Sequence, residues 1–193
     1  MESIIKSIMK KIIAAILTAV MILGIAGCNT GGVDDVMKEY TQALRKIDEE
    51  KVLALTVFEE SDPEAKDISD CFCFDGNASY IWEVYKAVAS TITLDYKSSD
   101  IVVSGDTAVV DFEYSIVDWE PLFKKRHLTA DDLVKAINTS TKTKTIEGSL
   151  VFNNVEGQWK ITKITNLDEL YAFSDDWPLL DTKQWPTIPA WDS

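Results

Sequence analysis

Apolar residues recur at helical spacing in the chain that follows residue 32. They stand three or four positions apart, at Val33, Val36, Met37, Tyr40, Leu44 and Ile47. This spacing puts them on one face and predicts an amphipathic helix over residues 33–47 that packs on a core. The pattern also predicts a second helical stretch over about residues 48–58 and a third over about residues 78–90, which Asn77 can cap.

After Ser90 the apolar spacing changes to two, which is typical of half-buried strands. Strands are predicted over residues 92–96, about 101–103 and, most clearly, 107–118. In the last of these, the residues predicted to face the core are Ala108, Val110, Phe112, Tyr114 and Ile116. Asp111 and Glu113 belong to the opposite side, so one face of the sheet is expected to meet water.

A short helix and two strands complete the pattern. Thr129 begins a capping-box sequence that predicts a helix over about residues 130–138. Strands follow over about residues 140–152 and 158–165, joined by a turn in which Gly157 supplies a positive φ. Helices followed by antiparallel strands predict an α+β fold.

The segment between the second and third helices is predicted to be a loop. Ser61-Asp62-Pro63 interrupts the helical spacing, and residues 71–74 suggest a short extended piece. That piece contains Cys71 and Cys73, for which three states remain open: structural or reduced thiols, a local disulfide, and a redox or metal site. No further Cys or second His is available to complete a metal site, so neither a metal nor a cofactor is predicted.

Residues 1–27 have the layout of a signal peptide. A basic region with Lys6, Lys10 and Lys11 precedes an uncharged apolar run over residues 12–26. This run of 15 residues is shorter than the roughly 20 that a membrane-spanning helix needs. A cleaved signal peptide is therefore predicted rather than a permanent transmembrane anchor.

Ile25-Ala26-Gly27-Cys28 resembles the bacterial lipobox, which implies cleavage before Cys28 and diacylation of its sulfur. Two acyl chains form a stable membrane anchor. The alternative is an ordinary secretory signal with a chance cysteine. The lipoprotein reading divides the chain into a signal peptide (1–27), a lipidated tether (28–32), a domain (33–173) and a C-terminal segment (174–193), with the protein on the extracytoplasmic side of the cell membrane.

The chain is strongly acidic, with a net charge of −13. Removal of residues 1–27, which carry three Lys and one Glu, changes this to about −15. Nucleic acid is excluded as a partner because phosphate recognition depends on clustered Lys and Arg. The acidity is expected to keep a tethered protein soluble and away from anionic lipid.

The order of elements resembles the cystatin-like cone of the nuclear-transport-factor-2-like superfamily, and within it uncharacterised lipoproteins of Gram-positive bacteria. The residues that carry this resemblance are 85–96, 101–110, Asp118 and 157–161. It implies helices packed into the concave face of a curved antiparallel sheet, with a pocket between them. Enzymatic members place an acid–base pair on the pocket wall. Here the single histidine, His127, follows Lys124-Lys125-Arg126 between strands, which departs from that pattern.

Several polar groups are candidates for binding. Asp111 and Glu113 form a carboxylate pair that can serve a ligand or acid–base chemistry only inside a pocket, and otherwise is a solvated strand face. The basic residues 124–127 either meet anionic lipid or wall polymer or form a solvated loop. Residues 139–145, with interleaved lysines, are expected to be a guarded edge strand rather than a binding stripe.

The C-terminal segment is unusual because tryptophans alternate with prolines. Trp177, Trp185 and Trp191 stand among Pro178, Pro186 and Pro189. Prolines prevent a regular helix, and a disordered tail seldom contains three tryptophans. The segment is expected to wrap the domain, or else to dock on a partner or carbohydrate through residues such as Trp185 and Trp191.

Three functions follow from these observations. The first is a non-enzymatic binding or interaction module at the cell envelope, which holds a small molecule, peptide or glycan. The second is a hydrolase or isomerase that uses Asp111, Glu113 or Tyr114 inside the pocket. The third is a structural envelope component whose pocket is filled by its own side chains. An open cavity with a buried carboxylate favours the enzyme, an open apolar cavity favours the binder, and a filled interior favours the third.

Overall fold

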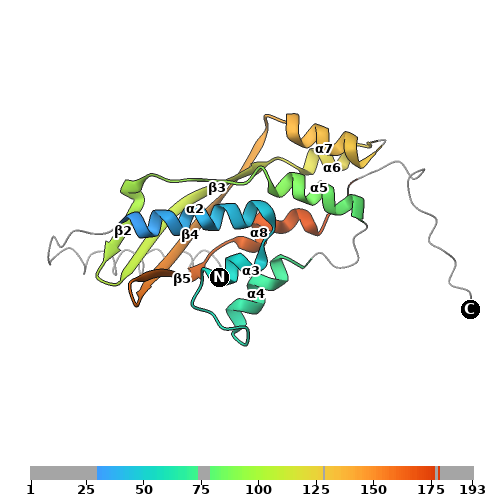
Figure 1. The fold of residues 1–193 in the computed structure, drawn as a ribbon. Helices are drawn as coiled ribbons and strands as arrows, with labels where there is room; N and C mark the ends of the chain where they lie inside the picture. The colour runs from blue at the N-terminus through green and yellow to red at the C-terminus, as the bar shows by residue number, and fades with distance from the viewer. Residues whose placement is uncertain (1–29, 74–78, 128, 177, 179–193) are drawn as a thin grey trace, which may run out of the picture.

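The computed structural model describes residues 30–73, 79–127, 129–176 and 178 (Figure 1). Within these ranges, four helices precede the sheet: α2 (Thr30–Lys46), α3 (Glu49–Ala54), α4 (Pro63–Cys71) and α5 (Ser79–Ala89). The predicted signal peptide, Cys28, Trp185 and Trp191 lie outside the described residues. Within the described ranges, no helix combines the length and apolarity that crossing a membrane demands.

The sheet consists of β1 (Thr93–Asp95), β2 (Ile101–Ser104), β3 (Thr107–Val117), β4 (Thr143–Val155) and β5 (Gln158–Ile164). All neighbouring strands are antiparallel, in the order β1-β3-β4-β5. β3 pairs with β4 along its whole length, and β1 and β2 pair with successive parts of its other edge. The short helix η1 (Ser98–Asp100) connects these two edge strands.

Helices cover one face of the sheet, and the opposite face meets water (Figure 1). The predicted inward residues of β3 are all buried, whereas Asp111 and Glu113 are exposed. The α+β class and the helix-covered antiparallel sheet predicted from the sequence are therefore confirmed.

α2 confirms the first predicted helix and begins earlier than expected. Val33, Met37, Tyr40 and Leu44 are fully buried on its inner face. Because α2 begins at Thr30, part of the predicted tether is helical. A Cβ atom at Gly32 would lie 2.7 Å from Trp159 Cδ1, so this glycine allows close packing rather than flexibility.

The second predicted helix is shorter than expected, because α3 ends at Ala54. The next residues join the sheet instead: Val57 N–H donates to Ile161 O over 3.0 Å, and Ile161 N–H donates to Leu55 O over 2.9 Å. Thr56 thereby forms a parallel bridge with Ile161 of β5. This short segment covers an edge strand, where unpaired backbone groups invite association with other chains.

The loop predicted over residues 61–76 is wrong for the part that forms α4. Asp62 occupies the N-cap position and Pro63 the first turn, where proline is favourable because its missing N–H would have no helical partner. Ala65, Ile68 and Phe72 face the core. The extended piece predicted at 71–74 is wrong at its start, since Cys71 is the last helical residue.

The later helices are short and lie at the end of the molecule away from the strand turns (Figure 1). They are α6 (Glu120–Lys124), α7 (Ala130–Thr139), α8 (Leu167–Tyr171) and the 3-10 helix η2 (Ala172–Ser174). The predicted cap of α7 is confirmed, because the Thr129 hydroxyl accepts a hydrogen bond from Asp132 N–H at 3.0 Å. α6, α8 and η2 have no counterpart in the sequence-based prediction.

The turn between β4 and β5 is tighter than the predicted residues 153–157. β4 continues to Val155, and Glu156 and Gly157 alone form the turn, with φ values of 53° and 87°. Two successive positive φ angles are typical of a type I′ hairpin turn. The predicted positive φ at Gly157 is confirmed.

Candidate functional site

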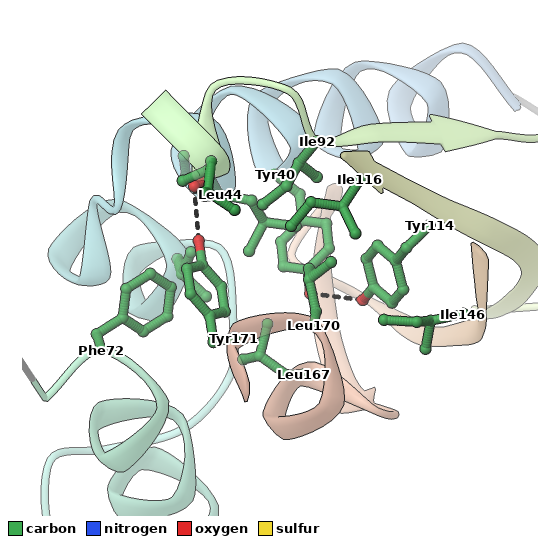
Figure 2. Close-up of a cluster of buried hydrophobic side chains, with 14 of the residues drawn as sticks. Tyr40, Leu44, Phe72, Ile92, Tyr114, Ile116, Ile146, Leu167, Leu170 and Tyr171 are labelled. Carbon is green, nitrogen blue, oxygen red and sulfur yellow. Dashed lines mark hydrogen bonds between the residues drawn. The ribbon is translucent and has the colours of Figure 1, made fainter. Parts of the chain in front are cut away.

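The space between the helices and the sheet is filled by the protein's own side chains (Figure 2). Tyr40 of α2, Tyr114 of β3 and Tyr171 of α8 meet there and are almost fully buried. The Tyr40 and Tyr114 hydroxyls lie 3.0 Å apart, and the Tyr171 hydroxyl donates to Leu44 O over 2.6 Å. Burial raises the pKa of each of these tyrosines, so all three are neutral hydroxyls at physiological pH.

Close ring contacts complete the filling of this interior. Phe112 and Tyr114 meet edge to face, with ring centroids 4.7 Å apart. A Cβ atom at Gly148, on the neighbouring strand β4, would lie 2.7 Å from Tyr114 Cε2. Every buried side-chain nitrogen or oxygen among the described residues has a hydrogen-bond partner. Among the described residues, this interior therefore has no unsatisfied polar side-chain group that a ligand could pair with.

A surface groove provides the space that the interior lacks. It lies between α4, β5 and α8 and has a volume of about 720 Å³. Of the apolar residues that line it, Phe58 and Ile164 are half-buried and offer surface, whereas Ile68, Leu167 and Tyr171 are almost fully buried beneath it. Exposed carboxylates surround it, from Glu64, Asp67, Asp70, Asp168 and Asp175. Lys163 is the cation that lines it.

The two helices that flank the groove place their carboxylates by helical spacing. In α4, Ala65 and Ile68 face the core, so Asp67 and Asp70 face outward. Asn166 is the N-cap residue of α8; its backbone is left-handed with a φ of 58°, and its side-chain amide donates to Glu147 O over 2.8 Å. The short helix then buries Leu167 and leaves Asp168 at the groove.

Cys71 lines the groove but is not poised as a nucleophile. Its Sγ donates to Asp67 O at 3.2 Å. Burial, followed by the carboxylates of Asp168 and Asp67, raises the pKa of the Cys71 thiol to about 11. The thiol is therefore protonated at neutral pH, whereas thiol chemistry depends on the thiolate. Cys73 is exposed, and the structure records both cysteines without a disulfide between them.

The carboxylates around the groove are dispersed. In the part of the chain that the structure describes, no group of three His, Cys, Asp or Glu side chains converges closely enough to hold a metal ion. The arrangement therefore offers a diffuse negative field around an apolar surface. It suits a cationic group attached to an apolar body, because such a ligand satisfies both features.

The polar candidates from the sequence lie apart from this groove. Asp111 and Glu113 are exposed on the sheet face that the helices do not cover. His127 is buried, and its Nε2 donates to Leu122 O over 2.9 Å. This hydrogen bond gives the imidazole ring a structural role. Trp185, Trp191 and Cys28, the predicted site of lipidation, lie outside the described residues.

Sequence reasoning missed the groove because it missed both helices that form it. The signals were present but short: an Asp-Pro helix start with apolar residues at Ala65, Ile68 and Phe72, and the spacing of Leu167, Leu170 and Tyr171 after β5. The approach of α4 to α8 depends on tertiary packing, which no local pattern reports.

One solved structure with a similar arrangement of elements is an NTF-2 like protein of unknown function from Shewanella oneidensis MR-1. The two chains are 13% identical, the match covers 70% of this chain and 95% of that chain, and the TM-score is 0.45. No protein-family model matches the sequence, and no curated protein matches it. The likeness concerns the arrangement of helices and sheet and transfers no activity to this chain.

Proposed function

We propose that this protein is a bacterial lipoprotein, anchored through diacylated Cys28 at the extracytoplasmic face of the cell membrane, and that its folded domain is a non-enzymatic interaction module. The basic region, the apolar run of 15 residues and the lipobox-like Ile25-Ala26-Gly27-Cys28 support the anchor. The single observation that supports surface binding is the contrast between the filled interior and the open groove of about 720 Å³.

The ligand class that the groove favours is a cation with an apolar portion, such as a basic amphipathic peptide or a hydrophobic amine. Glu64, Asp67, Asp70, Asp168 and Asp175 outnumber Lys163 around the groove. Phe58 and Ile164, which are half-buried, give the ligand's apolar portion a surface on which to bury. An uncharged glycan would neither pair with the carboxylates nor bury much apolar area in the groove.

The enzyme alternative has less geometric support. A hydrolase or isomerase needs a nucleophile or base whose pKa is tuned to its task. The thiol of Cys71 has a raised pKa, and Asp111 and Glu113 lie on the solvent-exposed sheet face. The purely structural alternative is favoured by the filled interior, and the groove experiment below distinguishes it from an interaction module.

The anchor is tested by Cys28→Ala in the full-length chain. We expect the variant to lose incorporation of labelled fatty acid and either to leave the membrane fraction or to remain unprocessed. Normal processing together with undiminished lipid labelling of the variant would show that Cys28 is not the acylated residue.

The groove is tested by charge removal at matched positions. Asp67→Asn, Asp70→Asn and Asp168→Asn together remove three charges from the groove, and Asp95→Asn, Glu147→Gln and Glu156→Gln remove three exposed charges elsewhere. The probe is an amphipathic Lys/Leu peptide, titrated by calorimetry. Exposed charge pairs contribute about 0.2–1 kcal/mol each, so the groove variant should bind roughly tenfold more weakly.

The control variant should bind the Lys/Leu peptide nearly as tightly as the unmodified protein does. An equal loss of peptide affinity in both variants would show that the peptide binds through non-specific charge attraction. Absence of peptide binding in the unmodified protein would overturn the groove as a binding site and leave the structural envelope component as the better reading.

A further inference from the structure

The start of α2 lies very close in sequence to the proposed lipid anchor. Cys28 precedes the first helical residue, Thr30, by two positions. Two residues of extended chain span at most about 7 Å. The acylated sulfur and the folded domain are therefore joined by a very short connection.

The beginning of α2 is packed firmly on the sheet. Gly32 lies against the Trp159 ring, and Val33 is fully buried. The Tyr96 hydroxyl donates to Asp34 Oδ1 over 2.7 Å, and Lys38 Nζ lies 2.6 Å from Asp34 Oδ2. This first turn cannot leave the sheet without breaking the contacts with Trp159 and Tyr96 and exposing Val33, so the start of α2, from which the anchor extends, is held against the strands.

The same end of the molecule carries the two hairpin turns (Figure 1). The β2–β3 turn and the β4–β5 turn are joined, since Asn154 N–H donates to Asp106 O over 2.7 Å and Thr107 Oγ1 donates to Asn153 Oδ1 over 3.3 Å. Trp159, which contacts Gly32, follows directly after the β4–β5 turn. We name the first turn of α2 with residues 104–107 and 153–159 the hairpin end.

The groove lies toward the other end of α2. Tyr171 of α8, which lines the groove, donates its hydroxyl hydrogen bond to Leu44 O. Leu44 follows Thr30 by fourteen residues, which corresponds to about 21 Å along the helix axis. The exposed basic residue Lys124 ends α6, and Lys125 and Arg126 follow it; α6 also lies at the far end (Figure 1).

We propose that the anchored domain sits on the membrane with its hairpin end toward the lipid headgroups and its acidic groove directed away from them. This inference rests on the proposed lipid anchor. Two of the exposed large apolar side chains, Val102 and Val155, lie on the strands of the hairpin end and are 49% and 45% exposed. They are the groups offered to the bilayer surface, whereas residues 124–126 face away from it.

Site-specific quenching tests the orientation in the full-length, acylated protein. A fluorophore is attached at Val155→Cys on the hairpin end or at Glu64→Cys beside the groove, in a background with Cys71→Ser and Cys73→Ser. Each protein is reconstituted in phosphatidylcholine vesicles that contain a headgroup nitroxide lipid. We expect the nitroxide to quench the label at position 155 several-fold more strongly than the label at position 64.

A longer tether provides the control. A flexible Gly/Ser insert of about twelve residues between Asn29 and Thr30 has an end-to-end distance of about 19 Å and should remove most of the difference between the two labels. Equal quenching at both positions without the insert, or stronger quenching at position 64, would overturn the orientation while leaving the anchor intact. Failure of the acylated protein to stay with the vesicles would overturn both proposals.

Discussion

Replacing the two central tyrosines one at a time and together gives a sharp test of the filled interior. The hydroxyls of Tyr40 and Tyr114 are fully buried and each is the other's hydrogen-bond partner, at 3.0 Å. Tyr40→Phe leaves the Tyr114 hydroxyl buried without that partner, which should lower the free energy of unfolding by about 1–3 kcal/mol. Tyr114→Phe should do the same to the Tyr40 hydroxyl.

The double variant should be much less destabilised than the sum of the two single variants. It removes both polar groups, and replacing a buried hydrogen-bonded pair by apolar groups of similar shape is nearly neutral. The coupling free energy from this double-mutant cycle should therefore approach the sum of the two single losses, about 2–6 kcal/mol. The assay is urea unfolding at pH 7, followed by tryptophan fluorescence and far-UV circular dichroism. Additive single and double effects would show that the hydroxyls do not form a buried pair, and single variants without any loss would show that water reaches them.

Other predictions concern alkaline stability, packing and thiol reactivity. Because burial raises the pKa values of Tyr40, Tyr114 and Tyr171, the unfolded state releases their protons first as the pH rises above about 10, and unfolding should become easier by about 1.4 kcal/mol per pH unit for each tyrosine. In the double Phe variant, the free energy of unfolding, measured with urea, should fall less steeply with pH between pH 8 and 11. An unchanged pH dependence would show that the buried tyrosines do not cause the alkaline destabilisation. Gly148→Ala should lower the free energy of unfolding by about 1–3 kcal/mol, because the added methyl group overpacks against Phe112 and Tyr114. Ser149→Ala, on the other face of β4, should have little effect. Equal stability of the two variants in urea would contradict the close contact at Gly148. Cys71 should react with iodoacetamide at pH 8 far more slowly than a thiol of ordinary pKa, measured in Cys73→Ser, and rapid labelling of the folded variant would contradict the raised pKa.

The elements that the sequence predicted well are those whose residues carry a complete local pattern. Over the first ten residues of β3, buried positions alternate with exposed or half-buried ones, so its phase could be read directly from the sequence. Thr129 supplies the whole capping signal of α7, and Gly157 supplies a positive φ that other residues rarely adopt. In these places one side chain or one period determines the backbone.

The elements that the sequence did not predict depend on distant partners. α8 has only five residues and owes its place to the burial of Leu170 and Tyr171 against α2 and the sheet. α3 stops at Ala54 because β5, more than a hundred residues later, takes the next backbone groups. Pro63 interrupts the helical spacing of the sequence, although proline is equally favourable in the first turn of a helix. The groove combines these elements and so lay beyond local reasoning.

The pairing of the early chain with the late chain also sets the order in which the protein can fold. The contact between Leu44 and Tyr171 joins residues 127 positions apart, and Lys160 Nζ reaches Ala54 O across 106 positions. On the proposed export route the chain emerges N-terminus first, so the apolar face of α2 stays uncovered until α8 has followed it. Contacts of such long sequence separation slow folding, because the loop between them must close first. The domain therefore cannot complete its fold until the C-terminal part of the chain has emerged. Until then, the apolar face of α2 needs protection from other chains.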